Sequence, residues 1–343
     1  MRKVPAVVFV LAVAAFPFGL VAGFAAPGRQ VGDYRQFLAI HTFSPSKSPS
    51  IILRTFVLDG RRCFVAVNPT DLRTSIQPAA ALPISASAVV ENSWESIRAR
   101  FKDSPYIKAI AEAESTDLPL QDAGITHFSP TQSGIDLTID LCPSSHPLDR
   151  QIFSAVFDAF GQEERPVPVA VAVTGVWMEQ HELDLRWLLD LESKKEISIT
   201  WVNHSFHHRL SRSLPLRENF LLEPGTDLRA EVLATEAKMI ALGLLPSVFF
   251  RFPGLVSDEK IFREISSFGL IPVGSDAWLG KNQWPKPGSI VLVHATGNEP
   301  VGIQRFLQLM KSERANIVTK HWLLFDLRES AINQEKDQPG VLL

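Results

Sequence analysis

The sequence has little cysteine and no marked excess of either charge. Cys63 and Cys142 are the only two cysteines among 343 residues, and their spacing does not form the C-x-x-C motif of thiolate zinc sites or redox sites. At most one disulfide can form, so a disulfide framework is excluded. The 34 Lys and Arg nearly balance the 37 Asp and Glu, leaving a net charge of −3. We expect no nucleic-acid partner, because binding to phosphates depends on a one-sided positive charge.

Long hydrophobic runs are also absent, except for one at the N-terminus. Arg2 and Lys3 precede an uncharged apolar run, Val4–Ala26, which is the layout of a secretory signal. Small residues around Gly23–Ala25 favour cleavage, whereas the length of the run, residues 4–26, favours an uncleaved membrane anchor. Both interpretations of residues 1–26 predict export, to the periplasm or the extracellular space. Without a second such run, a multispanning transporter is excluded.

The composition otherwise predicts a packed globular protein, with 45% hydrophobic and 21% charged residues. The first part of the mature chain, residues 27–124, has an irregular pattern. Two β-rich runs, Ile51–Val57 and Cys63–Val67, flank Asp59-Gly60, which is typical of a β-hairpin. A short helix is expected near Trp94–Lys102. We interpret residues 27–124 as an accessory β-containing segment.

After Gly124, short β-rich runs alternate with amphipathic helical patterns. The β-rich runs are Ile135–Leu141, Val167–Thr174, Ile197–Asn203, Val248–Arg251, Leu270–Ser275, Ile290–His294 and Trp322–Asp326. One helix is predicted over Asp227–Leu242, and another begins with Ser257 as N-cap and ends at Gly269. Such alternation predicts parallel strands joined by helical crossovers, either in a doubly wound sheet or in a closed β/α barrel.

Polar residues follow five of these runs at the point where each run ends. They are Asp140, Asn203–His208, Arg251–Gly254, Ser275–Trp278 and His294. In parallel α/β folds the carboxyl ends of the strands meet at one edge, where the active site lies. We therefore expect two carboxylates, a histidine cluster, an arginine and a lone histidine on one rim.

The order of these segments resembles the polysaccharide deacetylases, the NodB-homology or fourth carbohydrate esterase family, over Gly134–Asp326. Thr138–Ser144 stands in the place of the first family motif, T-F-D-D-G. The motifs H-S/T-x-x-H, R-x-P, an Asp/Trp motif and L-x-H follow in order as His204–His208, Arg251–Pro253, Asp276–Trp278 and Leu292–His294. The second motif is complete and the fourth is shortened. The resemblance implies an α/β fold, a distorted (β/α) barrel of the polysaccharide deacetylase type over residues 125–330, followed by a tail, 331–343.

The resemblance also implies a metal-dependent hydrolase that removes N- or O-linked acetyl groups from an acetylated polysaccharide or cell-envelope glycan. His204 and His208 would hold a divalent metal, with zinc as the first candidate. Asp140 would act as general base, with Arg251 beside it. Asp276 would orient that arginine.

The remaining positions implied by the resemblance concern the leaving group and the substrate. His294 would donate a proton to the leaving group. The backbone N–H near Gly254, next to Pro253, would help to bind the oxyanion. Trp278 would stack on a sugar ring or fill the barrel mouth. These residues complete the predicted site.

One departure from the family pattern concerns the metal. The family's second aspartate, a metal ligand, is Leu141 here, and leucine cannot coordinate a metal. Three replacements are open: Asp140 itself, which would leave the base to be reassigned; His146 or His207; or the thiolate of Cys142. We expect the two cysteines to form a buried thiol pair or one bridge rather than to serve as ligands.

The departure leaves a second function open, a catalytically silent relative that binds polysaccharide. Leu141→Asp would then create metal affinity that the natural chain lacks. A third reading is a glycosidase with Asp140 and Asp276 as its two carboxylates. It leaves the histidine cluster and Arg251 unexplained, and the arginine would keep a nearby carboxylate ionised. We favour the deacetylase.

Overall fold

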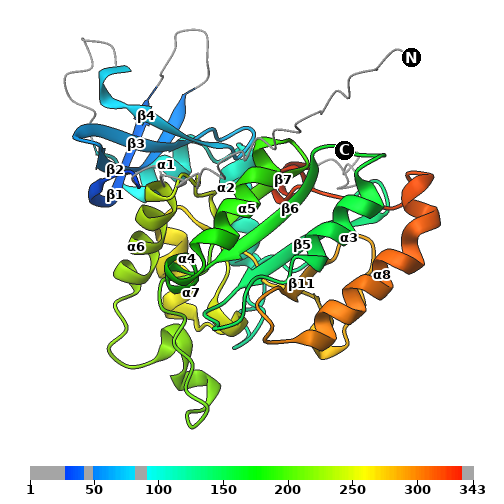
Figure 1. Ribbon diagram of the computed structural model, residues 1–343. Helices are drawn as coiled ribbons and strands as arrows, with labels where there is room; N and C mark the ends of the chain where they lie inside the picture. The colour runs from blue at the N-terminus through cyan, green and yellow to red at the C-terminus, as the bar shows by residue number, and fades with distance from the viewer. Residues whose placement is uncertain (1–27, 42–48, 82–90, 334–343) are drawn as a thin grey trace, which may run out of the picture.

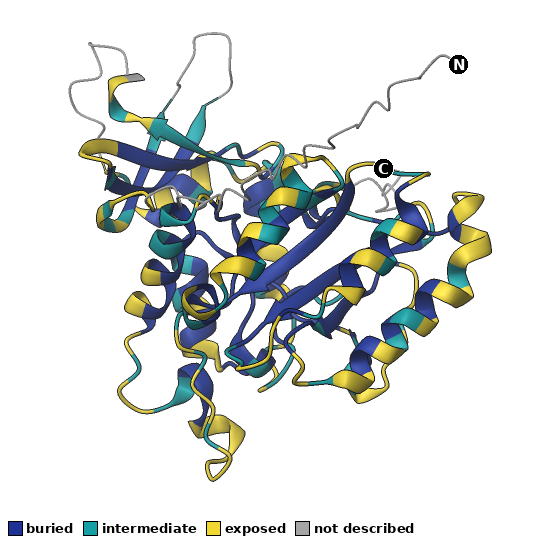
Figure 2. Ribbon diagram, in the orientation of Figure 1, coloured by how far each residue is buried: buried dark blue, intermediate teal, exposed yellow. Residues whose placement is uncertain are grey.

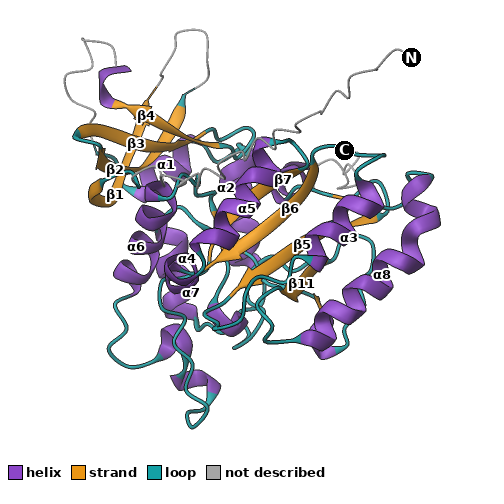
Figure 3. Ribbon diagram, in the orientation of Figure 1, coloured by secondary structure: helices purple, strands orange, loops and turns teal. Residues whose placement is uncertain are grey.

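The computed structural model describes residues 28–41, 49–81 and 91–333, which form one antiparallel and one mainly parallel sheet with helices around them (Figures 1 and 3). The predicted signal or anchor at residues 1–26 and most of the predicted tail lie outside the described residues. Within the described ranges, no helix combines the length and apolar character needed to cross a bilayer.

The antiparallel sheet comes first in the chain and has the strand order β1-β2-β3-β4. Its strands are β1 (Val31–His41), β2 (Ser50–Leu58), β3 (Arg61–Val67) and β4 (Thr74–Pro78). Asp59 and Gly60 join β2 to β3 with φ of 49° and 77°, the left-handed conformation that a two-residue hairpin turn of this kind requires. The predicted hairpin is confirmed. So is the short helix, α1 (Trp94–Arg100), which is followed by α2 (Pro105–Ser115).

The second sheet alternates with helices, as the sequence predicts. Its strands are β5 (Gly134–Leu141), β6 (Val167–Val173), β7 (Ile197–Asn203), β8 (Phe249–Phe250), β9 (Ile271–Pro272), β10 (Ala277–Trp278), β11 (Ile290–His294) and β12 (Leu323–Leu324). The helices are α3 (Gln151–Phe160), α4 (Gly175–Gln180), α5 (Glu182–Ser193), α6 (Leu228–Ala241), α7 (Glu259–Ser267), α8 (Pro300–Val318) and α9 (Leu327–Asn333).

The parallel sheet curls until its two ends meet in one segment of chain. Its strand order is β10-β11-β5-β6-β7-β8-β9, with all of these pairs parallel. Residues 271–278 contain both end strands, since β9 pairs with β8 and β10 pairs with β11. Ile125 adds a parallel bridge to Val273 beside this junction. The predicted distorted (β/α) barrel is therefore confirmed, and the doubly wound alternative is excluded.

Alternation along β5 separates the barrel interior from the outer layer. The odd-numbered residues from Ile135 to Leu141 belong to an apolar cluster with residues of α3, α5 and α8. The even-numbered residues include Thr138 and Asp140, which are also buried. Because successive strand residues point to opposite faces, the polar set faces the barrel interior, and the apolar set packs under the helices. Figure 2 shows the central strands as buried ribbons flanked by helices with exposed outer faces.

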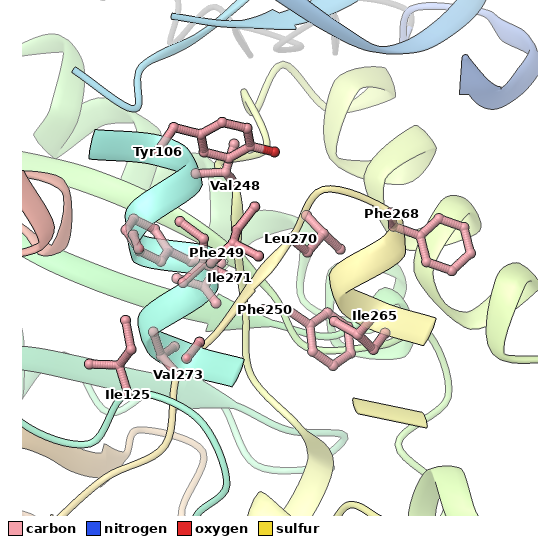
Figure 4. Packing of buried hydrophobic residues seen from close by; sticks show 14 of the residues in the cluster. Tyr106, Ile125, Val248, Phe249, Phe250, Ile265, Phe268, Leu270, Ile271 and Val273 are labelled. Atoms are coloured by element: carbon pink, nitrogen blue, oxygen red, sulfur yellow. The ribbon is translucent and has the colours of Figure 1, made fainter. Parts of the chain in front are cut away.

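The antiparallel sheet and the barrel share one continuous apolar core. This cluster includes Ile51 and Leu53 from β2, Tyr106 from α2, and Phe249 and Ile271 from neighbouring barrel strands. Figure 4 shows the last three of these residues in the packed interior. Burial of such large side chains contributes about 1.5 to 3 kcal/mol each.

A buried ion pair also joins the two parts. Nε of Arg54 on β2 lies 2.7 Å from Oε2 of Glu236 on α6, and Nη1 of Arg54 donates to the carbonyl of Phe268 at 2.7 Å. Both charged side chains are almost fully buried. Tyr34 donates its hydroxyl to the same carboxylate at 2.9 Å. Specific polar contacts thus fix how β2 sits on α6.

Helix boundaries differ from the sequence predictions by about one residue. The predicted helix over Asp227–Leu242 is α6, with Asp227 as its N-cap. For α7 the predicted N-cap, Ser257, is wrong: Asp258 caps the helix by accepting from the N–H of Ile261 at 2.8 Å. Ser257 instead donates its N–H to the carbonyl of Leu120. An aspartate one position later competes well for the cap, because its carboxylate also favours the helix dipole.

Candidate metal and catalytic site

The carboxyl ends of four barrel strands bring together residues that are far apart in sequence. Asp140 is the second-last residue of β5, His204 follows β7, Arg251 follows β8 and His294 ends β11. The first three are almost fully buried. Nε2 of His204 lies 3.7 Å from Oδ2 of Asp140. The strand ends therefore form one buried polar cluster, the arrangement in which parallel barrels carry active sites.

A group of three possible metal ligands lies within this cluster. Sγ of Cys142 lies 3.6 Å from Nε2 of His204 and 3.4 Å from Nε2 of His208, and the three ligand atoms lie within 4.8 Å of one another. His204 donates its Nδ1–H to the carbonyl of Arg251 at 2.9 Å, which leaves Nε2 free to coordinate. One thiolate and two imidazoles are a donor set that zinc accepts in catalytic sites. The residues present therefore fit a zinc ion.

The role expected for the cysteines needs correction. Both Cys63 and Cys142 are free thiols, so neither the bridge nor the thiol pair forms. Cys142 lies two residues after Asp140, on the inner side by strand alternation. Of the other replacements for the missing aspartate, His146 is exposed and His207 donates to Glu231. Asp140 lies beside His204, but it does not belong to the group of three. Among the described residues, Cys142 is therefore the replacement that lies with His204 and His208 in a group able to hold a metal.

The charge states of these ligands also suit coordination. Burial raises the pKa of the Cys142 thiol, but His208 and His294 outweigh it and bring that pKa down to about 7. Burial lowers the pKa of His204 below its ordinary value, even though Asp140 opposes this. At neutral pH the cysteine is therefore substantially a thiolate and His204 is neutral. These are the forms that bind metal.

Asp140 and Arg251 are buried charges with atoms left unpaired. Nη2 of Arg251 donates to Oγ1 of Thr138 at 2.8 Å, whereas its Nε and Nη1, and Oδ1 of Asp140, have no hydrogen-bond partner among the described residues. Burial lowers the pKa of Arg251, and the charge of Asp140 opposes that effect. Buried polar atoms are normally satisfied, so unpaired ones at the centre of a site indicate a place for a polar ligand.

The relay implied between Asp276 and Arg251 is not found among the described hydrogen bonds and ion pairs. Asp276 accepts instead from Nδ1 of His127 at 2.9 Å, and both side chains are partly exposed. His127 lies at the amino end of the barrel segment that follows Gly124, so its approach to Asp276 depends on how residues 271–278 close the barrel. No signal in the sequence pointed to His127.

His294 is paired with a residue that the sequence analysis missed. Its Nδ1–H donates to Oε2 of Glu299 at 2.9 Å, and Trp278 donates its indole N–H to the same oxygen at 2.8 Å. Burial lowers the pKa of His294, but the charges and hydrogen bonds of Cys142 and Glu299 outweigh burial and raise it well above its ordinary value. The raised pKa favours the imidazolium form of His294, which can act as an acid.

The loop after β7 is shaped by two residues that the motif does not include. Glu231, a buried residue of α6, accepts from the N–H groups of Phe206 and His207 and from Nδ1 of His207. Oδ1 of Asn203 accepts from the N–H of Ser205, which has a φ of 66°. These contacts turn the loop so that the ring of His208 lies against that of His204. The sequence offers one indication of this role: Glu231 is an acidic residue beside the apolar face of the helix predicted over Asp227–Leu242.

The predicted substrate residues have clear structural roles. Gly254 has a φ of 60°, and a Cβ there would lie 2.4 Å from the ring of Phe220. That ring packs on His208, with centroids 5.3 Å apart, so the glycine permits the contact that supports a metal ligand. Pro253 is buried beside Gly254. Trp278 packs against His294, with ring centroids 5.6 Å apart.

Comparison with solved structures yields proteins of the group that the motifs resemble. A family 4 carbohydrate esterase from Bacillus anthracis is 18% identical, the match covering 65% of this chain and 90% of that chain with a TM-score of 0.45. The chain is similar in fold to family 4 carbohydrate esterases. The peptidoglycan deacetylase PdaC from Bacillus subtilis is 16% identical, with coverages of 61% and 95% and a TM-score of 0.41.

A family 4 carbohydrate esterase pseudoenzyme from Bacillus anthracis is also similar, at 14% identity, coverages of 63% and 70%, and a TM-score of 0.43. No family model matches the chain. At identities of 14 to 18%, the chain is divergent in sequence from each of these three proteins.

Proposed function

We propose that the chain is a metal-dependent hydrolase that removes acetyl groups from an acetylated polysaccharide or cell-envelope glycan outside the cytoplasm. The observation that carries the proposal is the convergence of Cys142, His204 and His208 beside the buried carboxylate of Asp140. The motif order supports the substrate class, and the apolar run at residues 4–26 supports export. Residues 125–330 would form the hydrolase, with residues 27–124 as an accessory segment.

The metal in this proposal is zinc, held by Sγ of Cys142 and by Nε2 of the two histidines. Bound zinc supplies Lewis acidity, which lowers the pKa of water and polarises an acyl carbonyl. Three protein ligands leave a fourth position open, as catalytic zinc sites require. Cys142 thereby takes the place of the aspartate that is Leu141 in this chain.

The proton transfers are assigned to two residues on the paired strands β5 and β11, Asp140 and His294. Asp140 accepts a proton from the attacking water, and its charge interacts with that of the buried Arg251. His294 donates a proton to the departing nitrogen or oxygen. An amide nitrogen needs this proton more than an ester oxygen, so removal of N-acetyl groups depends more strongly on His294.

The experiment incubates the zinc-loaded full chain with N-acetylated and O-acetylated glycans and measures released acetate. We expect acetate release that is lost with a chelator and in His204→Ala, but kept in His146→Ala, which removes an exposed histidine. Acetate release that persists in His204→Ala would contradict the proposal. Retention of glycan by zinc-loaded protein without acetate release would instead assign a polysaccharide-binding role. Detection of new reducing ends would assign a glycosidase.

A further inference from the structure

Glu299 lies next to His294 at the edge of the candidate site and contacts it directly. Oε2 of Glu299 accepts from Nδ1 of His294 at 2.9 Å. The carboxylate side chain is 28% exposed and the His294 side chain 12%, so the pair is largely shielded from water. Burial raises the pKa of Glu299, but the hydrogen bond and charge of His294 reverse this and lower it. In this contact the imidazole N–H is the donor and the carboxylate is the acceptor.

The surroundings of Glu299 fix the direction of its carboxylate. The indole N–H of Trp278 donates to the same oxygen at 2.8 Å. A Cβ at Gly280 would lie 2.2 Å from that oxygen, so the absence of a side chain there makes room for the carboxylate. Two neighbouring residues thus hold or admit the oxygen that faces His294. An incidental surface contact would have no such support.

The position of Glu299 at the start of α8 would allow its side chain to cap that helix. Glu299 is the N-cap residue of α8, yet its side chain makes no capping hydrogen bond to that helix. N-cap side chains usually accept from the N–H groups of the first helical turn. The carboxylate here accepts from the histidine and the indole instead. The local helix therefore gives up a stabilising capping contact.

Asp276, the other carboxylate that follows a nearby strand, is paired with a different histidine. Asp276 accepts from Nδ1 of His127 at 2.9 Å, and no described hydrogen bond or ion pair joins it to His294. The two carboxylates therefore serve different histidines. This separation provides a matched pair of variants for an experiment.

We propose that Glu299 is the positioning residue for His294: it accepts the Nδ1–H, fixes the proton-bearing tautomer and leaves Nε2 to face the reacting groups. The proposal rests on the proposed function for its catalytic consequence. His294 donates the Nε2 proton to the leaving nitrogen or oxygen as the acyl bond breaks. The imidazole becomes neutral and keeps its Nδ1–H on Glu299. Solvent then returns a proton to Nε2 and removes the one that Asp140 took from water.

The first test reads the hydrogen bond by NMR of the full chain labelled with ¹⁵N-histidine. The His294 Nδ1–H resonance, assigned with His294→Gln, should lie at low field, as expected for a proton shared with a carboxylate. Glu299→Gln keeps the side-chain shape and removes the charge, so this resonance should shift upfield while that of His127 stays. Asp276→Asn should do the reverse. The proposal would be overturned if the His294 resonance did not shift in Glu299→Gln, or if it shifted in Asp276→Asn.

The second test separates positioning from structural support. With acetylated glycan as substrate, Glu299→Gln should lower kcat about 10- to 100-fold and leave KM nearly unchanged, because the loss concerns proton donation. Zinc stoichiometry should not change. An unaltered kcat would refute the role. If the natural chain releases no acetate, the proposed function fails, and the NMR comparison alone decides whether Glu299 holds His294.

Discussion

Sγ of Cys142 lies 3.4 Å from Nε2 of His208, a residue 66 positions later in the chain. The contact forms because the cysteine continues the inward-facing series of β5, two residues after Asp140, while the loop after β7 turns back at Ser205. Leu141, between the two inward-facing residues, points to the opposite side and belongs to the outer apolar cluster. The chain has thus placed a sulfur beside the histidines without an aspartate at position 141.

Removal of this sulfur should weaken metal binding without unfolding the protein. Cys142→Ser keeps the size of the side chain but replaces a thiolate by a poor ligand, so we expect zinc affinity to fall at least about 100-fold, or about 2.7 kcal/mol. Calorimetric titration of metal-stripped protein measures the change. Cys63→Ser is the matched control, since Cys63 lies on β3 in an apolar cluster that contains none of the site residues. If the two variants bound zinc with equal affinity, Cys142 would not be a zinc ligand.

Restoring the motif aspartate should not restore a ligand. Leu141 is fully buried on the outer face of β5, so Leu141→Asp would place an unpaired carboxylate among apolar side chains. We expect a loss of about 3 to 5 kcal/mol in the free energy of unfolding and no gain in zinc affinity. Leu141→Met, which conserves volume, should cost less than about 1.5 kcal/mol. Urea denaturation compares the two; a stable Leu141→Asp with tighter zinc binding would show that the strand register is wrong.

The Arg54–Glu236 pair should stabilise the attachment of the antiparallel sheet to α6. Arg54→Met leaves the buried carboxylate of Glu236 without its main partner. We therefore expect the free energy of unfolding to fall by about 3 to 5 kcal/mol. The double variant with Glu236→Leu removes both charges and should recover most of that loss. Denaturation of single and double variants in a mutant cycle measures the coupling. Purely additive losses would mean that the two charges do not interact.

Glu164 should make stability depend on pH. Burial, with the charge of Glu329, raises its pKa from 4.5 to about 7 in the folded chain. Between these two values the folded state binds more protons than the unfolded state, so the free energy of unfolding falls as pH rises and the loss is complete above about pH 7.

Glu164→Gln removes this dependence. We expect it to be more stable than the natural chain by about 1 to 2 kcal/mol near pH 8, allowing for partial exposure, and equally stable near pH 4. Thermal denaturation across this range tests the prediction. A stability difference independent of pH would show that Glu164 does not titrate as inferred.

The barrel and four members of the site could be predicted because they depend on local patterns. β-rich runs alternating with helical patterns indicate parallel strands, and the residue that ends each run then lies on one rim. This argument placed Asp140, His204, Arg251 and His294 together. Period-two counting from Asp140 also places Cys142 inside the barrel, although the sequence alone favours a pairing of this cysteine with Cys63 over the thiolate ligand that it leaves open.

The remaining site residues depend on packing between segments distant in sequence. Glu299 reaches His294 because its side chain leaves the N-cap of α8 and Gly280 admits it, and neither event has a signature in the sequence. His127 reaches Asp276 only because the barrel closes beside it. Tertiary contacts of this kind decide which carboxylate serves which histidine.

The most direct test of the account is zinc K-edge X-ray absorption on zinc-loaded protein. The account predicts one sulfur neighbour at about 2.3 Å, imidazole nitrogens at about 2.0 to 2.1 Å, and loss of the sulfur shell in Cys142→Ser. A spectrum containing only nitrogen and oxygen neighbours in the natural chain would contradict it, because Cys142 would then lie beside the histidines without binding the metal.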